Sequence, residues 1–166
     1  MTDAEQLVAE VVSLAGGKVA GRVRLQKIFY LLDQLGLKSG LRYAYHHYGP
    51  YSSDLTEAIS DAIAFKMIDE RTERRRDGVG YSVYSTCRDR PAKSLGSLDL
   101  SVAQIALLKM QPASATVLEL AATAHWLKHM EKLENWKAEL VRRKGVKTES
   151  GRTEAALSLL SELGLG

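Results

Sequence analysis

The sequence is short of the residues that cross-link a chain or bind metal. Its 166 residues include one cysteine, Cys87, which excludes an internal disulfide and a multi-cysteine zinc site. Cys87 falls at the end of a predicted strand, where a small buried thiol is expected rather than a nucleophile. No stretch approaches the ~20 apolar residues of a membrane span. The opening MTDAEQLVAEVV also lacks the basic and apolar regions of a secretory leader. We therefore expect a cytoplasmic protein.

The sequence also lacks a strong excess of either sign of charge. Lysine and arginine number 23 against 20 acidic residues, and the net charge of +3 is too small to imply a nucleic-acid partner by itself. Hydrophobic residues make up 45% of the chain and charged residues 26%, which is the ordinary globular range. The chain can therefore form a hydrophobic core, and the placement of its charges carries more information than their sum.

The first half of the chain alternates between helical and strand periodicity. Apolar residues at helical spacing predict helices over 3–14 and 22–35 and a third over 53–65. Alternating tyrosines predict a short strand over 42–48. Two further strands, 68–76 and 81–87, flank an Asp77-Gly78 turn. Three helices followed by a hairpin with a basic tip is the element order of a winged helix-turn-helix.

The second half contains helical patterns alone. After a linker over 88–99 that contains Pro91 and Gly96, helices are expected over 101–110, 113–130, 133–144 and 153–163. Nearly every position from Val117 to Leu127 is apolar or small, which predicts a central, buried helix. The expected fold is α+β and mainly helical. A winged helix-turn-helix-like module with a small β-hairpin wing spans residues 1–90. A C-terminal helical part, 91–166, packs on it to form a single structural unit.

The segment YHHYGPYSSDL crowds two histidines, three tyrosines and two serines around a Gly-Pro pair. Ser52, Ser53 and Asp54 stand where helix N-caps stand, and Asp54 with Glu57 matches the capping-box spacing. Gly49 permits an unusual backbone angle and Pro50 fixes the exit of the chain, so this pair is expected to form a structural turn. The three tyrosines are expected to pack around the corner with their hydroxyls at its wet edge: Tyr45, Tyr48 and Tyr51.

Catalytic and metal-binding motifs are not found. The serines lack a G-x-S-x-G turn, and His46 and His47 point to opposite faces of a strand. His125 and His129 share a helix face, but Trp126 stands where a zincin has its glutamate. We expect no catalytic residue, no metal and no cofactor. Whether the His125/His129 pair binds any ligand remains open.

Two segments resemble a known family. GRVRLQKIFYLLDQLG followed by YHHYGPYSSDLTEAISDAIAFKMI is similar to the Panacea domain, also called the SocA-like antitoxin domain, and to its YwgA-like relatives. In that group an LQK-hydrophobic-Tyr helix precedes a YGP turn that opens the next helix. The tail LELAATAHWLKHME…EAALSLLSELGL resembles the later helices of YwgA-like proteins. The resemblance implies an interaction module of toxin–antitoxin systems, acting as a toxin-neutralising antitoxin or a proteolytic adaptor.

Two functions are consistent with this pattern. The first is a winged-helix DNA-binding regulator. It is favoured by arginines of the wing that can bind DNA phosphates: Arg71, Arg74, Arg75 and Arg76. The helix that would enter the major groove is acidic and has no lysine or arginine before Lys66, which opposes that reading.

The second function, which we favour, is non-catalytic binding of a protein partner, such as a toxin or a protein destined for proteolysis. The wing arginines would then provide electrostatic steering of the partner at one rim of the interface. The expected contact residues are Tyr45, Tyr48, Tyr51, Asp54, Glu57 and Asp61. The partner's identity and the oligomeric state stay open.

Overall fold

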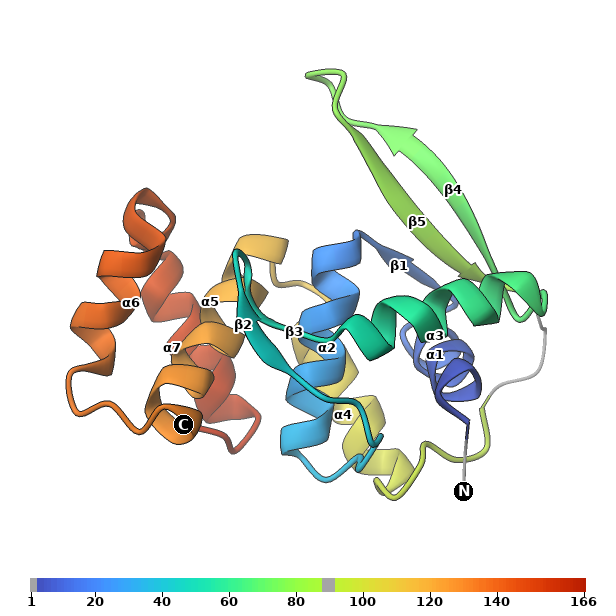
Figure 1. The fold of residues 1–166 in the computed structure, drawn as a ribbon, viewed down its shortest axis with the longest axis horizontal. Coiled ribbons are helices and arrows are strands. Elements are labelled where there is room, and N and C mark those ends of the chain that lie inside the picture. The colour runs from blue at the N-terminus through green and yellow to red at the C-terminus, as the bar shows by residue number, and fades with distance from the viewer. Residues whose placement is uncertain (1–2, 88–91) are drawn as a thin grey trace.

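The computed structural model describes residues 3–87 and 92–166 and confirms a mainly helical α+β fold (Figure 1). The helices are α1 Ala4–Leu14, α2 Arg22–Gln34, α3 Ser53–Ala64, α4 Leu100–Met110, α5 Ala115–His125, α6 Trp136–Lys144 and α7 Arg152–Glu162. The strands are β1 Lys18–Ala20, β2 Ala44–His46, β3 Gly49–Tyr51, β4 Ile68–Arg74 and β5 Gly80–Thr86. A π-helical turn, Trp126–Met130, follows α5, and a 3-10 turn, Gly145–Thr148, follows α6.

The N-terminal half packs three helices against an antiparallel sheet of order β1-β5-β4. In β4 and β5, Ile68 pairs with Thr86 and Arg74 with Gly80, so the two strands form a regular hairpin. This hairpin, the wing, projects away from the helices in Figure 1. Sequence periodicity missed β1, because three residues are too few to show an alternation and the strand depends on pairing with β5.

A second, two-stranded sheet corrects the expected turn at Gly49 and Pro50. β2 and β3 pair antiparallel, with His46 opposite Gly49 and Ala44 opposite Tyr51. The chain therefore reverses at His47 and Tyr48, and Gly49 and Pro50 lie in β3. Pro50 pairs with Tyr45 at the edge of a two-stranded sheet, a position where the missing proline N–H is tolerated.

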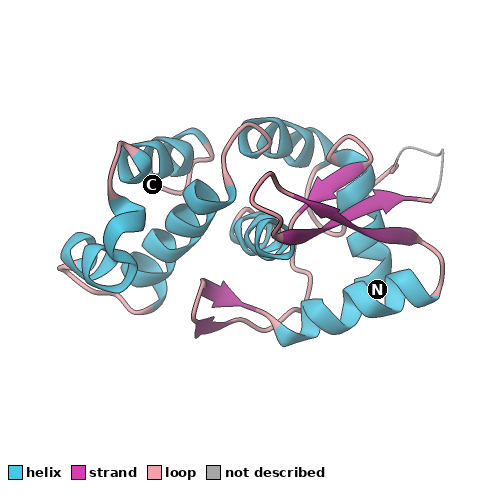
Figure 2. Ribbon diagram, turned by 90° about the horizontal axis from the view of Figure 1, so that it is seen from above, coloured by secondary structure: helices cyan, strands magenta, loops and turns pink. Residues whose placement is uncertain are grey.

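The C-terminal helices gather on one side of the molecule and the three-stranded sheet lies on the other (Figure 2). Val117–His125 of α5 is buried at every position, as its composition predicted. The helix predicted over 113–130 is shorter than expected. Ser114 caps α5 by accepting a hydrogen bond from the Val117 N–H at 3.1 Å, and the backbone changes to a π turn after His125. The next helix starts at Trp136, three residues later than predicted.

One hydrophobic cluster includes buried residues from both halves of the chain, among them Leu25, Ile68, Leu120 and Leu160. Part of the predicted linker, residues 88–91, lies outside the described residues. Its remainder joins this core through Leu95 and Leu98. Among the described residues, no helix combines the length and the apolar character needed to cross a membrane. Cys87 is exposed, which corrects the buried thiol we expected, because β5 ends before it.

Candidate partner-binding groove

The polar residues of the LQK segment hold the YGPYS segment in place. The Gln26 side chain of α2 accepts a hydrogen bond from the Ser52 N–H at 2.9 Å and donates one to the Ser52 carbonyl oxygen at 2.9 Å. Lys27 Nζ donates to the Pro50 carbonyl oxygen at 2.5 Å. Ser52 in turn caps α3, since its hydroxyl accepts from the Leu55 N–H at 3.2 Å. The two segments that carry the family resemblance therefore form one hydrogen-bonded unit.

The C-terminal helices hold the other side of the β2–β3 hairpin. Lys144 Nζ of α6 donates to the His47 carbonyl oxygen at 3.2 Å. The Arg143 guanidinium lies 4.7 Å from the centre of the Tyr45 ring. Lys147 Nζ lies 4.9 Å from the centre of the Tyr48 ring, within the range of a cation–π contact. The hairpin thus connects the N-terminal module to the helical part.

Gly49 has a backbone angle and a packing environment that only glycine suits. Its φ is +91°, which L side chains rarely adopt. A Cβ at this position would overlap Thr123 Oγ1 of α5 and would lie 3.8 Å from Lys27 Nζ. Thr123 Oγ1 has no hydrogen-bond partner among the described residues, and the backbone of Gly49 packs directly against it.

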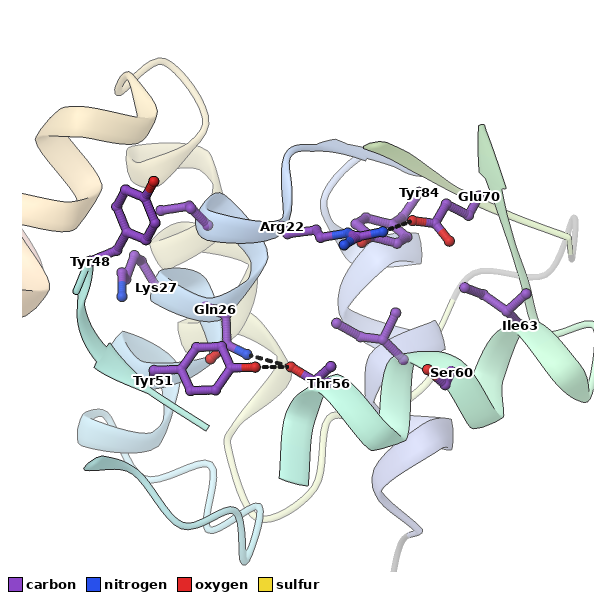
Figure 3. A pocket seen from close by; sticks show the side chains of 12 residues that line it. Arg22, Gln26, Lys27, Tyr48, Tyr51, Thr56, Ser60, Ile63, Glu70 and Tyr84 are labelled. Atoms are coloured by element: carbon purple, nitrogen blue, oxygen red, sulfur yellow. Dashed lines mark hydrogen bonds and ion pairs between the residues drawn. The ribbon is translucent and has the colours of Figure 1, made fainter. Parts of the chain in front are cut away.

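A cavity of about 260 Å³ opens between α2, α3, the β2–β3 hairpin and the wing (Figure 3). We call this cavity the groove. Its apolar wall is formed by Val23, Ile59 and Ile63. Tyrosines and polar side chains complete its lining: Arg22, Gln26, Lys27, Tyr48, Tyr51, Thr56, Ser60, Glu70 and Tyr84.

Hydrogen bonds fix much of the polar lining of the groove. The hydroxyls of Tyr51 and Thr56 lie 2.7 Å apart, and Gln26 Nε2 donates to Thr56 Oγ1 at 3.3 Å. At the wing end, Arg22 of α2 pairs with Glu70 of β4 at 3.2 Å (Figure 3). Hydrogen bonds from the side chains of Ser82 and Arg22 lower the pKa of Glu70. Hydrogen bonds and an ion pair therefore connect the polar walls of the groove, and tyrosines form its edge.

The hairpin end of the groove is rich in positive charge. Lys27 is only 1% exposed, and burial lowers the pKa of its ammonium to about 8. Glu119 of α5, which is 2% exposed, accepts hydrogen bonds from Lys147 at 3.0 and 3.2 Å. Lys144 Nζ lies 3.9 Å from the same carboxylate, and burial lowers its pKa too. Three lysines thus cluster around one carboxylate.

The expected contact residues divide into two sets on opposite sides of α3. Tyr48 and Tyr51 line the groove. Asp54, Glu57 and Asp61 line a different cavity with Glu5 and residues 39–41. The residues that we expected to form one docking surface therefore line two different cavities. Tyr48 and Tyr51 belong to the hairpin, whereas the three acidic residues lie on the side of α3 that faces away from the groove.

Two of the expected contact residues, Tyr45 and Asp54, make contacts within the protein. Tyr45 lies outside the groove, where its ring packs 6.5 Å from that of Trp126 and beneath Arg143. Asp54 does not cap α3, because Ser52 does. The Asp54 carboxylate accepts two hydrogen bonds from the Arg42 guanidinium, each 2.9 Å long. These bonds lower the pKa of Asp54 to about 2.

The wing arginines are spread over the hairpin. Strand register places Arg74 on the same face as Glu70 and Tyr84, which line the groove, and Arg71 on the opposite face. Arg75 pairs with Asp77 at 3.3 Å. Arg76 is exposed in the loop. Of the four wing arginines, Arg74 is the one on the strand face that borders the groove.

The two C-terminal histidines lie next to each other but differ in environment. The Tyr30 hydroxyl lies 2.8 Å from His125 Nδ1, and the rings of His125 and His129 are 4.5 Å apart. Burial, together with the nearby His129 and Lys128, lowers the pKa of His125 to about 4. Among residues 3–87 and 92–166, no three His, Cys, Asp or Glu side chains are grouped as metal ligands.

Sequence reasoning missed Gln26, Lys27, Arg22, Glu70 and Tyr84 as parts of the site. The signal for two of them was present: Gln26 and Lys27 lie between Leu25 and Ile28 on the buried side of α2. A polar pair that interrupts an apolar stripe must find internal hydrogen-bond partners. The pairing of Arg22 with Glu70 needs the three-dimensional fold.

The chain is 24% identical over 147 residues to the uncharacterised protein YwgA of Bacillus subtilis, a match that covers 89% of each protein. This distant similarity extends across both halves of the chain and agrees with the YwgA-like part of the resemblance. No protein-family profile matches the sequence.

Proposed function

We propose that the protein is a non-catalytic interaction module of the cytoplasm, of the antitoxin or proteolytic-adaptor kind, that takes a segment of a partner protein into the groove. The groove itself is the observation that carries this proposal. It has an apolar wall, a polar lining and an edge of tyrosines, and Tyr48 is 49% exposed beside it. Tyrosines with one wet side are frequent hot spots of protein interfaces.

Preorganisation supports the same proposal. Gln26 fixes the Ser52 backbone through both its donor and its acceptor, and Arg22 joins α2 to the wing. Because these walls are already ordered, little conformational entropy is lost when a partner segment binds. The resemblance of the LQK and YGP segments to the Panacea and SocA-like domains supports a toxin, or a protein delivered to proteolysis, as the class of partner.

A DNA-binding regulator is the second candidate, and the projecting wing favours it. Apart from the β2–β3 hairpin between α2 and α3, the order α1, β1, α2, α3, β4, β5 is that of a winged helix-turn-helix. Arg74, Arg75 and Arg76 lie near the tip of the wing. Against it, α3 exposes Glu57 and Asp61, which phosphates would repel. We expect weak, salt-sensitive and sequence-independent binding to duplex DNA. Tight binding to one site that is lost on Arg74→Ala with Arg75→Ala would favour the regulator.

Site-specific photo-cross-linking in the native host tests the protein-binding proposal. A photoreactive amino acid is placed at Ser60, an exposed α3 residue that lines the groove. The control position is Ser158, an exposed serine of α7 far from the groove. We expect one discrete cross-linked protein from position 60 that is absent from position 158. The same products from both positions, or none from position 60, would contradict the proposal.

A further inference from the structure

Another cavity lies at the end of the molecule where α5, α6 and α7 gather (Figure 1). Its volume is about 180 Å³, and it shares no lining residue with the groove. Its apolar lining consists of Ala124, Trp136, Leu157, Leu160 and Leu165, and Gly166 completes it. The polar side chains among the described residues that line it are all histidine or lysine: His125, Lys128, His129 and Lys137. We call it the basic cavity.

The two lysines of the basic cavity lack a negative partner. Lys128 Nζ and Lys137 Nζ lie 5.7 and 5.5 Å from the centre of the Trp136 ring, within the range of cation–π contacts. Across residues 3–87 and 92–166, neither ammonium forms an ion pair with an acidic side chain or with the C-terminal carboxylate. Both charges are therefore available to an incoming anion.

His125 has a ring nitrogen without a hydrogen-bond partner. The side chain is 6% exposed, and its Nδ1 lies 2.8 Å from the Tyr30 hydroxyl of α2. Its Nε2 has no hydrogen-bond partner in the part of the chain that the structure describes. This nitrogen is nevertheless not fully enclosed, unlike Glu10 Oε2 and Thr123 Oγ1, which are buried without a partner. Since His125 lines the basic cavity, a ligand in this cavity can reach Nε2.

The contact with Tyr30 indicates which tautomer His125 adopts. Burial, together with His129 and Lys128, lowers the pKa of His125 to about 4, so the ring is neutral at pH 7 and carries a single N–H. The Tyr30 hydroxyl is buried and has His125 as its hydrogen-bond partner. Its hydrogen is satisfied when it donates to Nδ1. Nε2 then carries the N–H and is a donor towards the basic cavity.

We propose that the basic cavity binds a small organic anion, namely a carboxylate on an apolar body about the size of one aromatic ring. This site is separate from the groove and goes beyond the proposed function. Lys128, Lys137 and the His125 Nε2–H supply the donors for the carboxylate, and the leucines of α7 supply the apolar contact. An apolar cavity of about 150 Å³ is large enough for benzene, so a volume of about 180 Å³ accommodates one ring.

The test is an NMR titration of the full-length, ¹⁵N-labelled protein with benzoate. The matched control probe is benzamide, which has the same shape and no charge. We expect saturable shifts of the Ala124, Leu160 and Leu165 amides at millimolar concentrations of benzoate only. The His125 ring gives a second readout in the same sample. Its imidazole ¹⁵N resonances should show the Nε2–H tautomer at pH 7, and benzoate should shift the Nε2–H proton signal.

Lysine variants test the charge. Lys128→Gln combined with Lys137→Gln should weaken benzoate binding by at least about tenfold, because charge-assisted hydrogen bonds to a carboxylate are strong. The matched control combines Lys66→Gln with Lys93→Gln, which removes the same charge at two exposed lysines that do not line the basic cavity. This control should bind benzoate like the wild type. Lys128 and Lys137 are also exposed, so both double variants should fold, which circular dichroism checks.

Each of four results would overturn the proposal. The first is no saturation by benzoate, and the second is equal shifts from benzamide. The third is undiminished benzoate affinity in the folded variant that lacks Lys128 and Lys137. The fourth is an Nδ1–H tautomer of His125, which would turn a lone pair instead of a donor towards the carboxylate.

Discussion

At the scale of single residues, the site depends on polar groups inside a helix–hairpin contact. Gln26 and Lys27 occupy buried positions of α2, where they bind the backbone of Ser52 and Pro50. A buried glutamine that satisfies both a backbone donor and an acceptor stabilises one conformation of that backbone. The LQK and YGPYS segments therefore determine the shape of the groove.

Gly49→Ala should destabilise the protein by more than backbone strain alone. The φ of +91° costs an alanine about 1–2 kcal/mol, and the new methyl group also meets Thr123 Oγ1. Gly78→Ala is the matched control, because Gly78 has a φ of +84° and nothing within 4 Å of its Cβ position. Urea unfolding should show a larger loss for Gly49→Ala.

Adding Thr123→Ala should recover part of the loss in Gly49→Ala, since it removes the overlapping hydroxyl. If the Gly49 and Gly78 variants lose equal stability and Thr123→Ala restores nothing, the close approach of the hairpin to α5 is wrong.

The buried charge of Lys27 should make stability depend on pH in the alkaline range. Its pKa is lowered from 10.5 to about 8 by burial, so the unfolded state binds more protons between these values. The free energy of unfolding therefore rises from pH 8 to pH 10.5 by an amount on the order of 3 kcal/mol from this group. Lys27→Met should lack this rise. Parallel pH profiles of unfolding for the two proteins would contradict the burial of a charged Lys27.

At the scale of elements, the β2–β3 hairpin has the central role. It is held from one side by α2 through Lys27 and from the other by α6 through Lys144. α3 begins directly after its Ser52 cap. One side of α3 lines the groove, and the other side lines the cavity that contains Asp54, Glu57 and Asp61. The hairpin, residues 44–51, thus contacts α2 and α6 and leads directly into α3.

Lys144→Met should loosen the hairpin without unfolding α3. The change removes the donor to the His47 carbonyl oxygen and a charge near Glu119. Hydrogen exchange should become faster at the β2 and β3 amides and remain slow at the buried face of α3. Arg142→Met, on the exposed side of the same helix, should change neither. Uniform acceleration across the chain would mean that Lys144 supports global stability only.

Helical periodicity was sufficient for α2 and α3, because their apolar residues recur at helical spacing within the helix itself. It placed the bounds of α5 and α6 less well, since Ser114 caps α5 and a π turn follows it. The wing was also predictable, because Asp77-Gly78 lies between two strand patterns. The strand β1, the reversal at His47 and the separation of Tyr48 from Asp54 were not predictable in this way. Each depends on contacts between residues far apart in the sequence, and a short, two-stranded sheet has almost no periodic signal of its own.

At the scale of the whole molecule, the two halves share a core and a polar junction. α5 contributes Leu118 and Leu120 to the core that also holds Leu25 and Phe29 of α2. The lysine cluster around Glu119 links α2, α5 and α6 at the back of the groove. The groove belongs to the N-terminal half, but its hairpin end is shaped by the C-terminal helices.

Removing residues 100–166 should therefore prevent the N-terminal half from folding alone. The truncation would expose the apolar α2 face that α5 covers and leave Lys27 without Glu119, and large exposed apolar patches promote aggregation. We expect loss of cooperative unfolding and an aggregated species in size-exclusion chromatography. A monomeric fragment with an unchanged melting temperature would show two independent domains.

The most direct test of the central claim is the affinity of the protein identified by cross-linking, measured by calorimetry with three forms of the chain. Ser60→Trp fills the groove from its α3 side, and Ser158→Trp adds the same bulk to an exposed position of α7. The account predicts that Ser60→Trp weakens binding by at least about tenfold, or about 1.4 kcal/mol, while Ser158→Trp binds like the wild type. Equal affinities for all three forms, with folding confirmed by circular dichroism, would show that the partner binds elsewhere and would contradict the groove as the binding site.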